Sequence, residues 1–247
     1  MFSEGMDAID AMANTVELIS RMGERDEEGI FRYLETMAEQ MPNMLAFYFV
    51  WDQDKYSPEV LSTNGQVQRM FLPVDQIVDN DWYEVPLKTG RYFMSSAGDY
   101  DYGGKIYTVI SVACPFYING KIAGVVGIDI AIDKIIQDVT NITVYDSGYA
   151  ALLTKELHFL AHPEASLVGQ QLAVDDGTKA KFAANESFIL PGKALKTGKP
   201  VYNFFTPIVF NRAQTYYYVG IGVPVDEMLA AAYSMRTMIA IIAIVSI

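Results

Sequence analysis

The first part of the chain has its apolar residues at helical spacing. The apolar positions are Met6, Ile9, Ala13, Val16 and Ile19, then Ile30, Tyr33, Leu34, Met37 and Met41. Steps of three and four residues place side chains on one face of an α-helix. The acids at residues 26–28 favour a helix start through the helix dipole, and Pro42-Asn43 ends the second run. Residues 1–44 are therefore predicted to form an N-terminal helical stalk.

After residue 44 the pattern changes to that of β-strands. Residues 45–52 are rich in aromatics, and residues 65–71 follow the turn residues Asn64-Gly65. Residues 105–117 and 121–132 are β-branched runs around Asn119-Gly120, a strong hairpin signal. Residues 133–139 have the pattern of a short helix. The aromatic, polar segment between residues 79 and 105 has no clean period, which predicts loop and short helix.

A smaller set of the same elements follows. Residues 148–154 and 158–163 predict one hairpin, residues 199–210 and 215–224 predict another, and residues 175–186 have a helical pattern. The prediction is an α+β fold, in which a long N-terminal helix precedes two modules with antiparallel sheets. The modules are expected at residues 45–140 and 141–224.

The chain ends in an apolar run. From Met238 to Ile247 only Ser246 is polar, and the run follows a helical stretch that contains Arg236. About ten residues are fewer than the roughly 20 that span a bilayer. We interpret residues 225–247 as a helix leading into a truncated transmembrane segment, and a buried core helix is the alternative.

The N-terminus lacks the continuous apolar stretch of a signal peptide.

Composition narrows the classes of partner. The 247 residues are 51% hydrophobic and carry a net charge of −12, so nucleic acid and anionic lipid surfaces are disfavoured as partners. The single Cys114 cannot form an internal disulfide, and His158 and His162 are too few for a typical zinc site. There is no nucleophile elbow, phosphate loop or metalloprotease motif. We therefore expect neither an enzyme nor a cofactor.

Several short motifs occur in a specific order. They are Trp82-Tyr83, Gly124–Ile130, Gly148-Tyr149-Ala150, His162-Pro163, Val168-Gly169 and Gly220–Pro224. This order resembles the double Cache (dCache) sensor domains of chemoreceptors and sensor histidine kinases, over essentially the whole chain. The resemblance implies two PAS-like modules on a long N-terminal helix, with a ligand in the membrane-distal module. It also implies a periplasmic or extracellular domain of an inner-membrane receptor, tied to the membrane by flanking helices.

The resemblance also points to ligand-binding positions. In the amino-acid-binding branch of the family, an Arg two residues before the Trp clamps the ligand carboxylate, and here that position is Asn80. Asn cannot replace a charged, bidentate donor, although Arg69 or Arg91 could do so from elsewhere. The candidate ligand-binding residues are Trp82, Tyr83, Asp129, Tyr100, Asp101, Tyr102, Tyr48, Trp51, Asn80 and Asp81. Carboxylates beside aromatic faces suit a cation, so the predicted ligand is a small organic amine.

Other interpretations remain open at this point. The ligand could be an amino acid or carboxylate, and the chain could be a soluble periplasmic binding protein or enzyme. Trp82 and Tyr83 could pack a flap on the sheet, Asp129 could cap the next helix, and residues 99–102 could form a solvated loop tip. His162, before Pro163, has the pattern of a structural residue. A homodimer is expected, because Met6, Ile9, Val16 and Ile19 offer more apolar face than one module can cover.

Overall fold

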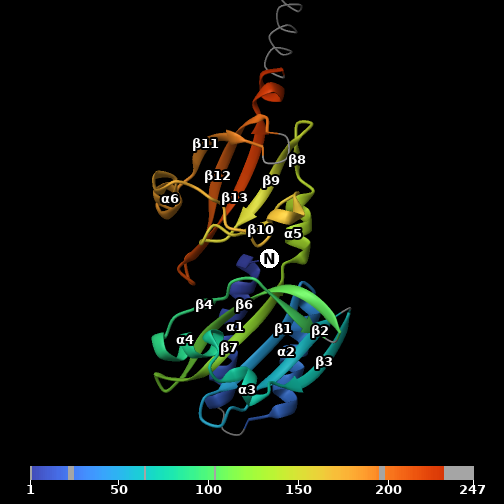
Figure 1. The fold of residues 1–247 in the computed structure, drawn as a ribbon. Coiled ribbons are helices and arrows are strands. Elements are labelled where there is room, and N and C mark those ends of the chain that lie inside the picture. The colour runs from blue at the N-terminus through green and yellow to red at the C-terminus, as the bar shows by residue number, and fades with distance from the viewer. Residues whose placement is uncertain (1, 22–24, 64, 103, 195–197, 231–247) are drawn as a thin grey trace, which may run out of the picture. The chain divides into compact units, whose positions relative to one another are not determined.

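The computed structural model describes residues 2–21, 25–63, 65–102, 104–194 and 198–230. The chain forms two compact units. The first module contains the residues up to Asp133 together with Asn211–Gln214, and the second contains Lys134–Phe210 with the described residues from Thr215 onwards. Both modules combine helices with antiparallel sheet (Figure 1), so the predicted α+β class is confirmed.

The sheet of the first module runs in the order β3-β2-β1-β7-β6-β4, and β5 also pairs with β6. Its strands are β1 (Met44–Trp51), β2 (Pro58–Thr63), β3 (Gln66–Phe71), β4 (Phe93–Met94), β5 (Gly98–Tyr102), β6 (Lys105–Ile118) and β7 (Lys121–Ala131). The turn between β6 and β7 uses Asn119 and Gly120, both with positive φ (52° and 77°). Two positive φ values are the mark of the tight hairpin turn that Asn-Gly predicts.

Helices α1 (Phe2–Arg21) and α2 (Glu27–Gln40) belong to the first module. Figure 1 shows both behind the strands in this view. Met6, Ile9 and Val16 are buried within this single chain, and Ile19, the fourth residue of the face expected to pair, is half-buried. The inference that these residues leave a surplus apolar face is therefore wrong, because the module itself covers most of that face.

The segment between residues 79 and 105 is more regular than predicted. Helix α3 (Val74–Ile77) precedes it, and within it α4 (Asp81–Thr89) leads into β4 and β5. Residues 99–102, treated as a possible loop tip, pair with β6 as part of β5. This strand has mostly exposed side chains, and an edge strand without a buried face shows no alternation in its sequence.

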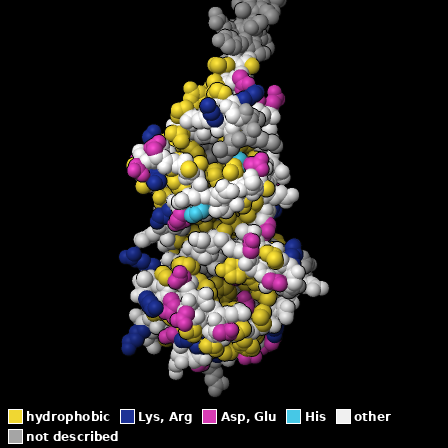
Figure 2. Space-filling view, viewed as in Figure 1, with side chains coloured by type: hydrophobic (Ala, Val, Ile, Leu, Met, Phe, Trp, Pro, Cys, Tyr) yellow, Lys and Arg dark blue, Asp and Glu magenta, His cyan; other side chains and the backbone are white. Residues whose placement is uncertain are grey.

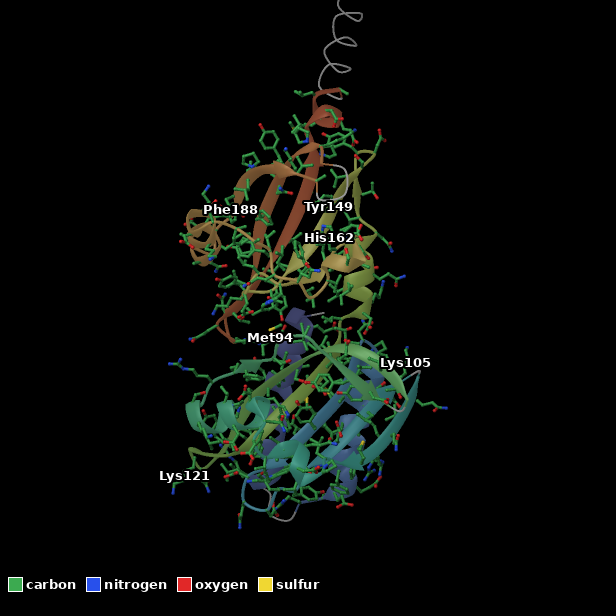
Figure 3. The ribbon with its side chains drawn as sticks, viewed as in Figure 1. Met94, Lys105, Lys121, Tyr149, His162 and Phe188 are labelled. Atoms are coloured by element: carbon green, nitrogen blue, oxygen red, sulfur yellow. The ribbon has the colours of Figure 1, made fainter. Side chains whose placement is uncertain are left out.

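The second module has a sheet in the order β10-β9-β13-β12-β11, with β8 paired to β9. Its strands are β8 (Thr143–Val144), β9 (Gly148–Leu153), β10 (Phe159–Ala161), β11 (Phe188–Lys193), β12 (Pro200–Phe210) and β13 (Thr215–Pro224). The helical elements are α5 (Asp133–Thr140), the 3₁₀ turn η1 (Ala165–Leu167) and α6 (Asp176–Ala183). Within this module the side chains of Tyr149 and His162 lie together (Figure 3), with ring centroids 5.0 Å apart.

Residues 225–230 are helical. The apolar run from Met238 to Ile247, predicted to enter a membrane, lies outside the described residues. None of the described helices has the length and apolar character needed to span a bilayer.

Gly124 marks the closest packing between strands of the first module. A Cβ there would lie 2.0 Å from the Val50 carbonyl oxygen and 2.4 Å from the Phe116 ring. The Val50 backbone cannot move aside, so Gly124→Ala is expected to lower the free energy of unfolding by about 3 kcal/mol. Urea unfolding followed by tryptophan fluorescence measures this, because Trp51 and Trp82, the only tryptophans in the sequence, both belong to the first module.

Gly98→Ala is the matched control for this change. A Cβ there meets only the ring of Tyr100, at 3.0 Å. That side chain is 50% exposed and can move aside, so the expected change is within about 0.5 kcal/mol. Equal unfolding midpoints for the two variants would contradict the packing argument.

Candidate functional site

A cavity of about 580 Å³ lies over one face of the sheet in the first module. Its lining residues come from β1, β2, β3, β5, β6, β7 and the α3–α4 segment. They are Tyr48, Glu59, Leu61, Gln68, Met70, Leu72, Asp75, Gln76, Asn80, Trp82, Tyr100, Asp101, Tyr102, Ser111 and Asp129. In Figure 2 the visible face of the first module is hollowed between hydrophobic side chains, with acidic side chains nearby.

Strand register explains why distant residues meet on this floor. Asp129 of β7 is paired with Ala46 of β1 on one side and with Ser111 of β6 on the other. Tyr48, two residues along β1, is paired with Glu59 of β2 and Gly127 of β7. Because paired residues and residues two apart share a face of a sheet, the Asp129, Tyr48, Glu59 and Ser111 side chains all face the cavity.

Asp129 is a deeply buried acid of the floor, with 8% of its surface exposed. Its Oδ2 accepts a hydrogen bond of 2.5 Å from the Tyr102 hydroxyl. Its Oδ1 is buried and has no hydrogen-bond partner among the described residues. Burial raises the pKa of this carboxyl, although hydroxyl groups around it favour the charged form. A buried acceptor without a partner is costly, so Asp129 Oδ1 is prepared to receive a donor from a ligand.

Glu59 is a second buried acid, 4% exposed, on the adjacent strand pair. Burial, with a smaller contribution from the negative charge of Asp129, raises the pKa of Glu59 to about 8. A carboxyl group with such a pKa is largely protonated at neutral pH in the empty cavity. Together the two acids form a floor that a positive charge would stabilise.

Aromatic rings surround this floor. The ring of Tyr48 meets that of Trp82 edge to face, with centroids 4.9 Å apart. A Cβ at residue 127 would lie 2.1 Å from the Tyr48 ring, so the glycine leaves the space in which this ring lies over β7. Tyr100 and Tyr102 of β5 complete the aromatic part of the lining. The cavity therefore combines carboxylates with π faces, as cation sites do.

Seven of the ten predicted residues line the cavity, and Tyr83, Trp51 and Asp81 do not. The hydroxyl of Tyr83, the neighbour of Trp82 on α4, donates to Asp52 Oδ1 at 2.5 Å. Trp51 is three residues from Tyr48, so strand alternation places it on the opposite face, where its ring meets that of Phe116. Asp81 is exposed in the first turn of α4, where an acid complements the helix dipole.

The structure also locates the possible replacements for the missing arginine. Arg69 donates to both Glu28 and Glu35, at 2.6–3.1 Å, and does not line the cavity. Arg91 is also absent from the lining. The Asn80 side chain donates to the Gln76 carbonyl at 3.0 Å. Among the lining residues that the structure describes there is no Lys, Arg or His.

Sequence analysis missed the contribution of β2 and β3. Glu59, Leu61, Gln68 and Met70 line the cavity from these strands. Residues 58–63 were not predicted as a strand, and Pro58 at the start obscures it. Val60 and Leu61 follow Glu59 without the apolar-polar alternation of a half-buried strand, so the sequence carries no clear local signal for Glu59. No group of three or more His, Cys, Asp or Glu side chains in the described residues is placed to hold a metal ion.

Comparison with known proteins agrees with the class that this fold and cavity define, a ligand-sensing domain of PAS-like modules. The Cache domain family profile matches residues 4–232. The chain therefore belongs to the Cache domain family, whose members are extracytoplasmic sensor domains of receptors.

Individual relatives are receptors as well. The methyl-accepting chemotaxis protein PscA of Pseudomonas syringae pv. tomato is 29% identical over 131 residues, which is 52% of this chain and 20% of that protein. The extracellular domain of mmHK1S-Z2, described as a histidine kinase, has a TM-score of 0.72 at 22% identity, over 92% of this chain and 93% of its own. The Pseudomonas aeruginosa chemoreceptor PctC domain, in complex with GABA, has a TM-score of 0.64 at 17% identity, over 90% of each chain.

Proposed function

We propose that this Cache domain senses a small organic amine, bound as an ammonium ion in the cavity of the first module. The observation that carries the proposal is the unpartnered, buried Oδ1 of Asp129 in a lining with four acids and no described basic residue. An ammonium N–H would satisfy this oxygen, and the rings of Tyr48 and Trp82 would cover the organic part of the ligand.

The same lining disfavours a ligand that also carries a carboxylate. Such a group would need a cationic or multiple-donor partner, and the position where the family has its arginine holds Asn80, whose side-chain N–H groups are directed to local carbonyl oxygens. Asp75 and Asp101 line the cavity with exposed side chains, and their negative charges, screened by water, add a weak repulsion of a ligand carboxylate. PctC shares the fold with this chain, and its complex with GABA does not determine the ligand here.

The proposal extends to the whole receptor. The domain would be periplasmic or extracellular, attached to the inner membrane by flanking helices, and paired with a second copy in a chemotaxis or two-component receptor rather than acting as an enzyme. Ligand binding would act through different affinities for two conformations of the first module. Sedimentation of the receptor with and without an amine tests the pairing, and a strict monomer in both conditions would exclude it.

Calorimetric titration with butylamine and GABA tests the ligand class directly. The two molecules share a four-carbon chain and an amino group, and they differ in the terminal carboxylate of GABA. We expect butylamine to bind at least tenfold more tightly, because the carboxylate would lose its hydration without gaining a partner. GABA binding as tight as that of butylamine, or tight binding of an α-amino acid added to the same titration while butylamine does not bind, would overturn the proposal.

A further inference from the structure

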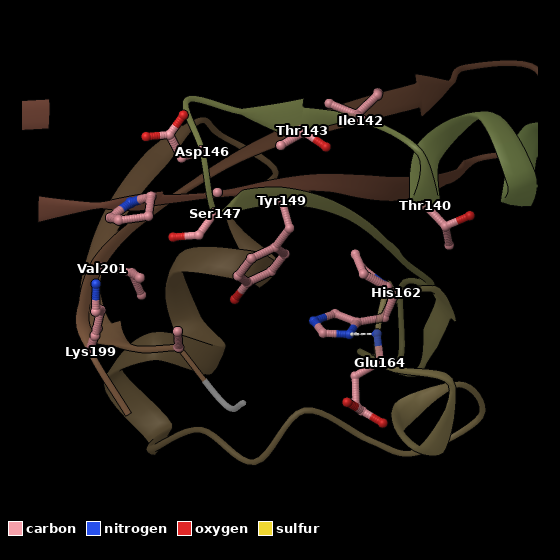
Figure 4. Close-up of a pocket in the computed structure, with 14 residues that line it drawn as sticks. Thr140, Ile142, Thr143, Asp146, Ser147, Tyr149, His162, Glu164, Lys199 and Val201 are labelled. Carbon is pink, nitrogen blue, oxygen red and sulfur yellow. Dashed lines mark hydrogen bonds between the residues drawn. The ribbon is translucent and has the colours of Figure 1, made fainter. Parts of the chain in front are cut away.

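The second module contains a cavity of its own, of about 300 Å³. Figure 4 shows its walls, which come from the segment after α5, the start of β9, the segment after β10 and the start of β12. Ile142, Pro163, Val201 and Pro224 supply apolar surface. The hydrogen-bonding groups of the lining indicate which kind of ligand this cavity could bind.

The decisive polar group is the imidazole of His162, a residue with 7% of its surface exposed. The rings of Tyr149 and Phe159 meet it edge to face, at 5.0 and 5.1 Å between centroids, and fix its orientation. Its Nδ1 accepts a hydrogen bond of 2.9 Å from the Glu164 backbone N–H. In the neutral imidazole the proton must then reside on Nε2. Burial lowers the pKa of His162, which keeps the ring neutral at neutral pH.

The Nε2–H of His162 has no hydrogen-bond partner among the described residues. In Figure 4 this nitrogen is directed into the cavity, towards Tyr149, while Nδ1 is turned to Glu164. Two other polar groups of the wall already have partners. Lys199 pairs with Asp226 at 2.9 Å, and the Ser147 hydroxyl donates to Glu227. Among the described lining residues, the Nε2–H of His162 is therefore the buried donor without a partner that a ligand here would have to satisfy.

The charges of the lining residues indicate which kind of hydrogen-bond acceptor a ligand could present to His162. Asp146 and Glu164 contribute to the lining, and the positive charge of Lys199 is balanced by Asp226. The described lining residues offer a carboxylate no net positive charge. An ammonium ion could bind to Asp146 or Glu164, but it would leave the Nε2–H of His162 without an acceptor, because its own N–H groups are donors. An uncharged carbonyl oxygen carries no negative charge and can accept the hydrogen bond from Nε2–H. The apolar lining residues could contact a short hydrocarbon part of the same ligand.

We propose that the second module is an independent binding site for a small uncharged molecule, whose carbonyl oxygen accepts a hydrogen bond from His162 Nε2–H.

Such a site would be coupled to the helical residues 225–230. The carboxylate of Glu227 accepts from the backbone N–H groups of Asp146 and Ser147, at 2.9 and 3.1 Å. The neighbouring Asp226 accepts from Lys199. The lining residues Asp146, Ser147 and Lys199 therefore all form hydrogen bonds to the first turn of these helical residues. Pro224, which also lines the cavity, directly precedes this turn. A bound ligand would bias the position of this turn relative to the sheet of its own module.

Histidine NMR tests the proposal without knowledge of the natural ligand. The sequence has two histidines, and His158 is exposed, so it serves as the internal reference. The chain labelled with ¹⁵N-histidine would be titrated with propionamide, propionate and propylammonium, three probes of similar size. We expect propionamide to shift the His162 signals saturably, with a dissociation constant on the order of millimolar, and to leave those of His158 unchanged. Propionate and propylammonium should give no saturable shift.

Two variants complete the experiment. His162→Phe keeps a ring and removes the donor, while Ile142→Trp fills the mouth of the cavity from a residue that is 45% exposed. Both should abolish saturable propionamide binding, which for His162→Phe is measured by ligand-detected NMR because this variant lacks the His162 signals. Both should leave butylamine binding to the first module unchanged. Absence of a saturable shift in the unaltered chain, or a shift by propylammonium alone, would overturn the proposal.

Discussion

Replacement of Asp129 by asparagine is expected to weaken butylamine binding by roughly 30-fold to several-thousand-fold, because it removes one partner of a buried, hydrogen-bonded charge pair. The amide would keep the size of the side chain and would offer the ammonium ion a neutral oxygen. Titration calorimetry measures the affinity, and the fluorescence of Trp82, a cavity residue, gives a second measurement of occupancy.

The stability of the same variant distinguishes a ligand-binding role from a structural one. Burial raises the pKa of Asp129, so the folded state disfavours its charge at neutral pH. Asp129→Asn removes that charge, and the free energy of unfolding of the empty domain at pH 8 should be unchanged or higher. A variant that loses both affinity and stability would indicate that Asp129 holds the sheet together instead.

Asp101→Asn provides the matched control. Asp101 lines the same cavity but is exposed, and its Oδ1 accepts from the Gly104 backbone N–H at 2.7 Å. Exposed charges interact weakly with a ligand because water screens them. We expect a change in butylamine affinity of threefold or less, roughly the effect of one surface charge. Equal losses for Asp101→Asn and Asp129→Asn would contradict the assignment of Asp129 as the ammonium partner.

The strand and helix patterns explain which site residues could be predicted from the sequence. Asp129 stands out as the one charged residue in a long apolar run, and Tyr48 and Trp82 lie in aromatic segments. The error at Trp51 was avoidable, since a residue three positions from Tyr48 in a strand must face the other side of the sheet. That Trp82 lines the cavity and Tyr83 does not could not be predicted without knowing the direction of α4, because neighbouring residues of a helix face about 100° apart.

Glu59 shows what the sequence pattern could not provide. It lies near Asp129 only because β1 stands between β2 and β7, a strand order that no local pattern reveals. The raised pKa of Glu59 comes from this tertiary burial. Likewise, His162-Pro163 predicts a structural residue, whereas the unpartnered Nε2 becomes evident only once the side chains around it are placed.

The affinity for butylamine is expected to rise with pH up to about pH 8 and to level off there. In the empty cavity Glu59 holds its proton up to about pH 8, and a bound ammonium ion would favour the carboxylate and expel that proton. Release of one proton makes affinity increase by about tenfold per pH unit below the pKa of the empty site. The amine itself stays protonated over this range, so the change belongs to the protein.

The free energy of unfolding of the empty domain changes with pH in the direction opposite to the butylamine affinity, because it falls as the pH rises. Between the ordinary pKa of 4.5 and the folded-state pKa of about 8, folded Glu59 keeps a proton that the unfolded chain has released. The stabilisation from this group is complete below 4.5 and is lost as the pH rises through 8. Glu59→Gln, which cannot titrate, should remove both effects together. Calorimetry of butylamine binding at pH 7 in buffers of different ionisation enthalpy counts the protons released, and an identical count in Glu59→Gln would assign the titration to another group.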